Sequence, residues 1–120
     1  MATILAVDDS AAMRQMVGIT LTGAGHQVEQ AADGCEALQM AERRKFDLVI
    51  TDVNMPKMDG ITLVRELRGL ASYKFVPLLV LTTEATTERK QAGKAAGATG
   101  WLVKPFNPEK LLATIAKVLG

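Results

Sequence analysis

Several features that would indicate other classes of protein are scarce in this chain of 120 residues. One cysteine, Cys35, permits no internal disulfide and fits a reducing compartment, so we expect a cytoplasmic protein. No apolar run approaches the ~20 residues of a membrane-spanning helix, and the first residues lack the basic stretch of a signal peptide. The 14 Lys and Arg against 13 Asp and Glu leave a net charge of +1, which argues against a nucleic-acid-binding face. We therefore expect a protein that binds neither membrane nor nucleic acid. We also expect a monomer.

Short apolar runs alternate with helical patterns along the chain. The expected strands are residues 3–7, 26–30, 48–51, 78–81 and 101–103. The expected helices are residues 10–23, 34–44, 60–69, 86–97 and 107–119. This alternation predicts an α/β fold with a doubly wound five-stranded parallel sheet, and the length suits a single domain over residues 1–120.

The strand patterns also predict the order within the sheet. Runs 48–51 and 78–81 are continuously apolar, as in central strands covered on both faces. Segment 26–30 instead alternates around one apolar centre, which is typical of an edge strand. This difference favours the order 2-1-3-4-5 of a flavodoxin-like (α/β)5 sheet.

Local signals mark helix boundaries and one weak helix. Asp33, Asp59 and Asn107 stand where residues that cap helices are expected. The helix around 86–97 contains Gly93 and an apolar face of alanines only, so it is a candidate for movement. In the first helix we expect the methionines at positions 13 and 16 to fill the core.

Polar side chains follow four of the five expected strands. Parallel strands meet with their carboxyl ends at one edge, where open α/β sheets bind ligands. The residues expected at this edge are Asp8, Asp9, Asp52, Thr82 and Lys104. Each one alone also has a structural explanation, because acids cap helices and form turns and a threonine often ends a strand. Their conjunction favours one shared pocket.

This set suits a divalent metal and a phosphoryl group. Clustered carboxylates repel one another, and a bound cation relieves that repulsion. Mg²⁺ is usually bound by one or two carboxylates, several waters and a phosphate oxygen. Asp9 and Asp52 can supply the carboxylates directly, and Asp8 can act through a water. A carboxylate is also a possible nucleophile. A metal, the Lys104 ammonium and the Thr82 hydroxyl could each neutralise one phosphoryl oxygen.

The sequence resembles the receiver domain of two-component response regulators, and within that family the CheY-type single-domain receivers of chemotaxis. The matching motifs occur at four strand ends, at the family's spacing. They are Val-Asp-Asp-Ser (7–10), Asp-Val-Asn-Met-Pro-Lys-Met-Asp-Gly (52–60), Leu-Thr-Thr-Glu-Ala (81–85) and Gly-Trp-Leu-Val-Lys-Pro-Phe (100–106).

The resemblance implies a role for each matching residue. Asp52 occupies the phosphorylated position, and Asp8 and Asp9 match the acidic pair that binds Mg²⁺. Asn54 matches the residue whose backbone carbonyl is a further metal ligand.

Other matches imply roles in switching. Thr82 and Lys104 match the hydroxyl and ammonium that contact the phosphate. Trp101 stands at the switch position, where the family usually has Tyr or Phe. The Lys104-Pro105 peptide is expected to be cis.

By the same resemblance, the chain is a stand-alone, Mg²⁺-dependent phosphoacceptor without an output domain. It would take its phosphoryl group from a histidine kinase and act as no enzyme beyond its own phosphorylation and dephosphorylation. Its output would be a changed protein-binding face at the fourth helix, fifth strand and fifth helix. Flagellar motor control through a motor switch protein is the leading expectation, and a shuttle or phosphate sink in another phosphorelay is the alternative.

Two other classes use a similar sheet. A haloacid-dehalogenase-like phosphatase normally carries a second Asp two residues after its nucleophile, and here that residue is Asn54. A flavodoxin binds a flavin phosphate in a hydroxyl- and glycine-rich loop after its first strand. Here that loop contains Asp8 and Asp9, which would repel a phosphate without an intervening metal.

Overall fold

Strands and helices alternate through this computed structural model, which describes residues 1–120. The strands are β1 Thr3–Val7, β2 Gln27–Ala31, β3 Leu48–Thr51, β4 Leu78–Thr82 and β5 Gly100–Val103. The α-helices are α1 Ala11–Gly23, α2 Gly34–Arg43, α3 Gly60–Arg68, α4 Thr87–Ala96 and α5 Pro108–Leu119. None of these helices is long and apolar enough to span a membrane.

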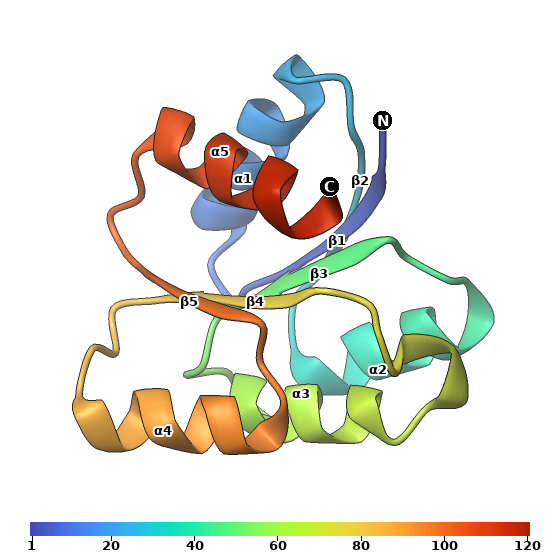
Figure 1. The fold of residues 1–120 in the computed structure, drawn as a ribbon, viewed down its shortest axis with the longest axis vertical. Helices are drawn as coiled ribbons and strands as arrows, with labels where there is room; N and C mark the ends of the chain where they lie inside the picture. The colour runs from blue at the N-terminus through green and yellow to red at the C-terminus, as the bar shows by residue number, and fades with distance from the viewer.

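The five strands form one parallel sheet in the order β2-β1-β3-β4-β5, which confirms the predicted fold class. Helices α1 and α5 cover one face, and α2, α3 and α4 cover the other (Figure 1). Strands β3 and β4 are buried at every residue, whereas β2 and β5 form the two edges. Central strands have both faces covered, and this explains why β3 and β4 are apolar up to the threonine that ends each of them.

The core has two layers, one on each side of the sheet. Alternate residues of β1 belong to different layers, since Leu5 and Val7 pack toward α2 and α3 while Ile4 and Ala6 pack toward α1 and α5. This is the two-residue period of a strand. With both layers apolar, the sheet is held in a single register and its strand ends stay aligned.

The predicted helix caps are confirmed. The side chains of Asp33, Asp59 and Asn107 each accept a hydrogen bond from the backbone N–H three residues later. Ser10 caps α1 in the same way, so this helix begins directly behind the acidic pair. Capping fixes where the loops after the strands end.

Asp59→Ala is expected to lower the free energy of unfolding by about 1 kcal/mol at neutral pH. Burial is the largest single influence and opposes ionisation of Asp59, but the hydrogen bonds from Thr62 and Ile61 and the charge of Arg89 together outweigh it and lower its pKa. A lowered folded-state pKa stabilises the protein above the pKa of an unfolded aspartate, about 3.9, and this contribution disappears as the pH falls through the folded-state value.

Urea unfolding at neutral and acidic pH measures this effect. Asn107→Ala is the matched control, because it removes a neutral cap and should cost a similar amount at both pH values. An Asp59→Ala cost that is equally large in acid would contradict the assignment.

Three local expectations are wrong, and one element was not expected. Strand β2 begins one residue late, at Gln27, because the backbone N–H of His26 donates to the Leu21 carbonyl near the end of α1 and not to β1. Met16 is 54% exposed and does not fill the core. Ala95, which was expected on the apolar face of α4 with Ala92 and Ala96, is exposed, whereas Gly93 is buried. A 3-10 helix at Ala71–Tyr73 was not expected.

Candidate functional site

The polar residues singled out at strand ends lie at the same edge of the sheet. Val7 pairs with Thr51, so the residues that follow β1 and β3 leave the sheet side by side. Thr82 pairs with Val103, which places Lys104 beside the end of β4. Parallel pairing alone therefore brings distant parts of the chain to one place.

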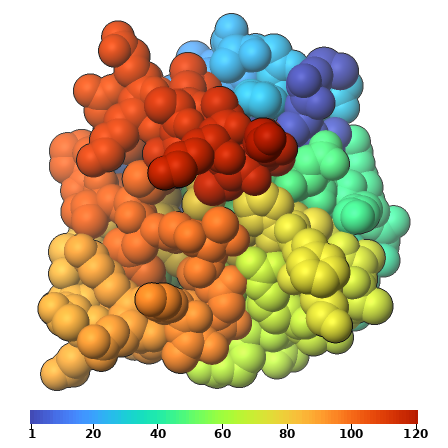
Figure 2. All heavy atoms as spheres, viewed as in Figure 1, coloured from blue at the N-terminus to red at the C-terminus, as the bar shows by residue number.

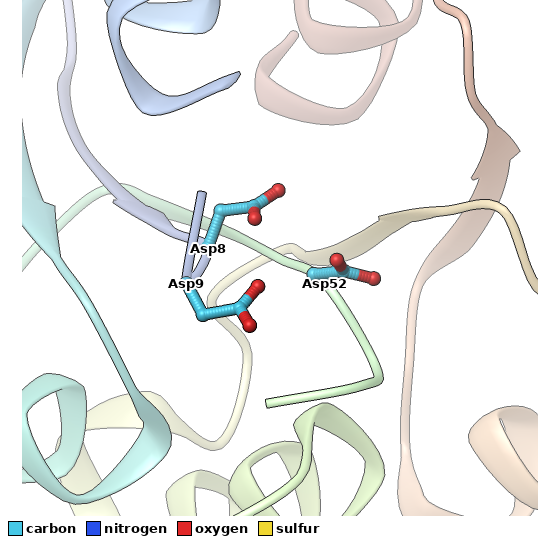
Figure 3. A group of neighbouring side chains, drawn as sticks. All are labelled: Asp8, Asp9 and Asp52. Carbon is cyan, nitrogen blue, oxygen red and sulfur yellow. The ribbon is translucent and has the colours of Figure 1, made fainter. Parts of the chain in front are cut away.

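Three carboxylates form the centre of the site. Asp8, Asp9 and Asp52 each offer an oxygen, and these oxygens lie within 4.8 Å of one another. Figure 3 shows the side chains of Asp8 and Asp9 extending from the end of β1 toward Asp52 at the end of β3. Asp8 and Asp52 are buried and Asp9 is exposed, so the cluster opens to solvent on the Asp9 side.

Lys104 bridges two of these carboxylates. Its Nζ donates to Asp8 Oδ2 at 2.6 Å and to Asp52 Oδ2 at 2.9 Å. Burial alone would lower the pKa of Lys104, but the hydrogen bonds and negative charges of the two aspartates outweigh it, so its pKa is raised. The ammonium therefore stays charged at neutral pH and neutralises part of the acidic cluster.

Backbone groups hold the buried carboxylates in place. The N–H of Ser10 donates to Asp8 Oδ1 at 2.9 Å, and the N–H of Val53 donates to Asp52 Oδ1 at 2.6 Å. Each aspartate thus has one oxygen fixed by the backbone and the other by Lys104. This arrangement leaves the carboxylates little rotational freedom.

Sequence reasoning missed two residues that support the site. Arg14 of α1 donates from its guanidinium to the backbone oxygen of Asp8 at 2.6 Å. Gly60 packs so closely beneath β3 that a Cβ there would overlap the Asp52 carbonyl oxygen. The sequence marked Gly60 only as a helix entry, because close approach between distant backbones has no local signature.

Thr82 lies at the same edge but outside the carboxylate cluster. It is fully buried, and its hydroxyl accepts a hydrogen bond from the Glu84 N–H at 3.2 Å. Its carbonyl accepts from the Lys104 N–H at 2.8 Å. The hydroxyl therefore belongs to the start of the β4–α4 loop.

Glu84 connects this loop to two other predicted site residues. Its carboxylate accepts a hydrogen bond from Asn54 Nδ2 at 3.3 Å, above the end of β3. Its backbone carbonyl accepts from Trp101 Nε1 at 2.8 Å. Trp101 lies on the α4 side of the sheet and Leu102 on the other, as strand alternation predicts, so the indole stands apart from the acidic cluster. The Lys104-Pro105 peptide is cis, as expected.

The donor atoms of the cluster are all oxygens. Hard cations such as Mg²⁺ and Ca²⁺ bind carboxylate oxygens, and Mg²⁺ uses only one or two of them and retains several waters. The exposed Asp9 leaves room for such waters. Lys104 neutralises one of the three aspartate charges, and the two negative charges that remain match a divalent ion. The residues present therefore fit Mg²⁺.

Comparison with known families agrees with this geometry. Residues 4–116 match the response regulator receiver domain. The chain belongs to this family. The match includes every site residue discussed above and all of the five strands except Thr3, the first residue of β1.

Similar solved structures include a single-domain receiver of chemotaxis. The Vibrio cholerae chemotaxis protein CheY4 is 59% identical, with a TM-score of 0.94, and 98% of each chain is covered. The receiver domain of the sensor histidine kinase PA1611 from Pseudomonas aeruginosa is 29% identical, with a TM-score of 0.93 and coverage of 99% of this chain and 98% of that one. That structure has a magnesium ion coordinated in its active-site cleft.

Curated relatives include larger regulators. The response regulator MprA of Mycobacterium leprae is 43% identical over 116 residues, which are 97% of this chain and 50% of that protein. The chain thus spans about half the length of MprA. Family membership follows from these matches.

Proposed function

We propose that this receiver accepts a phosphoryl group on Asp52 from a histidine kinase and thereby switches its binding to another protein. The observation that carries the proposal is the bridge from Lys104 to Asp8 and Asp52 inside a cluster of three carboxylates. A buried carboxylate with an ammonium beside it and an opening to solvent can attack a phosphorus and have the added charge neutralised.

In the transfer, an Asp52 carboxylate oxygen forms a bond to the phosphorus of phosphohistidine. The P–N bond breaks, and the donor imidazole leaves with the electron pair and takes up a proton. The Lys104 ammonium, whose Nζ is already 2.9 Å from Asp52 Oδ2, then donates a hydrogen bond to a phosphoryl oxygen in place of one to a carboxylate. The Thr82 hydroxyl donates to another phosphoryl oxygen after its hydrogen bond from the Glu84 N–H breaks. Mg²⁺ would be held by Asp9, Asp52 and the Asn54 carbonyl, with Asp8 acting through water, and would neutralise charge on the phosphoryl group.

The proposed output is control of the flagellar motor. CheY4, a chemotaxis protein, is 59% identical and is covered over 98% of its chain, and this similarity supports the proposal. The proposed protein-binding face is formed by α4, β5 and α5, where a groove of about 400 Å³ is bordered by Lys90, Trp101 and Lys110. The proposed site of action is the cytoplasm, which the single cysteine favours.

Transfer from a phosphorylated kinase tests this function. A chemotaxis histidine kinase carrying labelled phosphate should lose the label to this chain in the presence of Mg²⁺, and the labelled chain should bind a flagellar motor switch protein more tightly than the unlabelled chain. Transfer without any change in motor binding would favour a shuttle or phosphate sink. The absence of transfer from every histidine kinase tried, together with no uptake from small phosphodonors, would contradict the proposal.

Mg²⁺ is expected to raise the melting temperature of the unphosphorylated protein. The ion relieves repulsion among Asp8, Asp9 and Asp52, and a ligand at ten times its Kd stabilises the folded state by about 1.4 kcal/mol. Asp9→Ala should abolish this response and leave the metal-free protein no less stable, because it removes one of the clustered charges.

Thermal unfolding with millimolar MgCl₂ measures the response. Glu66→Ala, which alters an exposed acid on α3, should retain the full Mg²⁺ effect. A wild-type melting curve that is indifferent to Mg²⁺ would contradict the metal site.

Trp101 is proposed to carry the switch to the binding face. When Thr82 turns to the phosphoryl group, the loop containing Glu84 must move, and with it the acceptor of the indole N–H. The emission of this single tryptophan should therefore change when beryllofluoride, a phosphate mimic, is added with Mg²⁺.

Thr82→Ala should reduce this change in emission without blocking phosphorylation, whereas Thr83→Ala, at the exposed neighbouring position, should not reduce it. If Trp101→Ala still switches partner binding normally, the indole does not couple the two sites.

A further inference from the structure

The indole of Trp101 packs against bare backbone in the middle of α4. A Cβ built on Gly93 would lie 2.6 Å from Trp101 Cζ3 and 3.0 Å from Cε3. Carbon atoms pack at about 3.5–4.0 Å, so the indole occupies the space where any other residue would have a side chain. Gly93 is buried inside the helix, where glycine is unfavourable relative to alanine. Accommodation of the indole gives a physical reason for this otherwise costly residue.

The same indole is attached to the loop that begins α4. Its Nε1 donates to the Glu84 carbonyl at 2.8 Å, two residues after Thr82. The ring thus contacts the middle of the helix while its N–H holds the loop before it. A movement of the loop and a movement of α4 both act on this one side chain.

The far end of α4 is anchored to α3. Arg68 donates from Nε to the Gly97 carbonyl at 2.9 Å and from its terminal nitrogens to Thr99 Oγ1 at 3.2 Å and to the carbonyl of Val76 at 2.7 Å. The first turn of α4, in contrast, is exposed at Thr87 and Glu88. Figure 2 shows α4 (light orange) on the surface beside β5 and the segment that follows it (darker orange). The first turn of α4, which follows the loop after Thr82, is therefore less constrained than the end of the helix at Gly97.

We propose that Gly93 is a positioning residue of this receiver: its missing side chain forms the seat of the Trp101 indole, and the seated indole holds α4 in the position seen here. The packing of the indole on Gly93 does not depend on any function, whereas the effect of Gly93 on switching rests on the proposed function. A methyl group at position 93 must displace either the indole or α4, so the resting position of one of them changes without phosphate.

A double-mutant cycle on the unphosphorylated protein tests the seat. In the Trp101→Ala background, Gly93→Ala should increase the equilibrium constant for folding about two- to fivefold, because alanine is the better helix former and the space is vacant. With Trp101 present, the same substitution should decrease it. Gly18→Ala in α1 is the control, since its Cβ would meet only the flexible Gln30 side chain at 3.4 Å and its effect should be equal in both backgrounds. An effect of Gly93→Ala that has the same sign and size with and without Trp101 would overturn the proposal.

The effect on the switch is measured by tryptophan emission. Gly93→Ala should shift the emission at rest and reduce the further change caused by beryllofluoride and Mg²⁺, while uptake of a phosphoryl group is retained. Wild-type emission at rest and a wild-type response would show that Gly93 does not position the indole. If neither the unaltered chain nor the Gly93→Ala variant responds to beryllofluoride and Mg²⁺, the proposed function fails. The double-mutant cycle and the emission at rest then still decide whether Gly93 seats the indole.

Discussion

Asp52→Asn is expected to abolish the uptake of a phosphoryl group from a small phosphodonor in the presence of Mg²⁺, whereas the unaltered chain should gain the mass of one such group. The amide keeps the shape of the side chain but lacks the anionic oxygen that attacks phosphorus. It also removes the charge that Lys104 contacts at 2.9 Å. Intact-protein mass spectrometry measures the difference directly.

Asp47→Asn provides the matched control. This exposed acid accepts a hydrogen bond from the Thr3 N–H at the opposite edge of the sheet, so the same chemical change there should leave phosphoryl uptake intact. Equal labelling of the Asp52→Asn chain and the unaltered chain would show that another residue is the acceptor.

Gly60→Ala is expected to cause the largest loss of stability among these substitutions, roughly 2–4 kcal/mol. The added Cβ would overlap the Asp52 carbonyl oxygen and lie 3.1 Å from Val53 Cα. Both are backbone atoms that cannot rotate away, and the Gly60 N–H also donates to the Val53 carbonyl at 2.9 Å. Any relaxation must therefore move the end of β3 and with it Asp52, so phosphorylation should slow as well.

Urea unfolding of Gly60→Ala against Gly23→Ala measures this cost. A Cβ on Gly23, at the end of α1, meets no atom within 4 Å, so that substitution should be neutral or slightly stabilising. Similar stability of the two variants would contradict the close packing beneath Asp52.

The arrangement of the sheet could be predicted because burial dictates the sequence of its strands. Strands β3 and β4 are covered on both faces and are apolar up to the threonine that ends each of them, while the edge strand β2 has Val28 between polar residues and one buried alanine at its end. Once the order is known, the ends of β1 and β3 must adjoin, and Asp8, Asp9 and Asp52 follow those ends. The strand order, which can be predicted from the sequence, therefore brings the acidic residues together.

The details that escaped prediction depend on contacts between distant segments. The 3-10 helix at Ala71–Tyr73 places the Tyr73 hydroxyl where it donates to the Arg44 carbonyl at 2.7 Å and accepts from the Phe46 N–H at 3.0 Å. No local pattern announces partners almost thirty residues away. Gly93 shows the same difficulty, because the sequence marked it as a weakness of α4 whereas the structure places an indole against it.

If Asp52 is the phosphoacceptor, its phosphoryl group should be bound by a metal, Lys104 and Thr82 together. A crystal structure of the chain with beryllofluoride and Mg²⁺ would show this arrangement. We expect the fluoride adduct on an Asp52 carboxylate oxygen, the metal bound by Asp9, Asp52 and the Asn54 carbonyl, and the Lys104 ammonium and Thr82 hydroxyl each on a fluorine. An adduct on any other residue, or an adduct on Asp52 with Lys104 still bridging Asp8 and Asp52 and no metal beside it, would show that Asp52 does not act in this way.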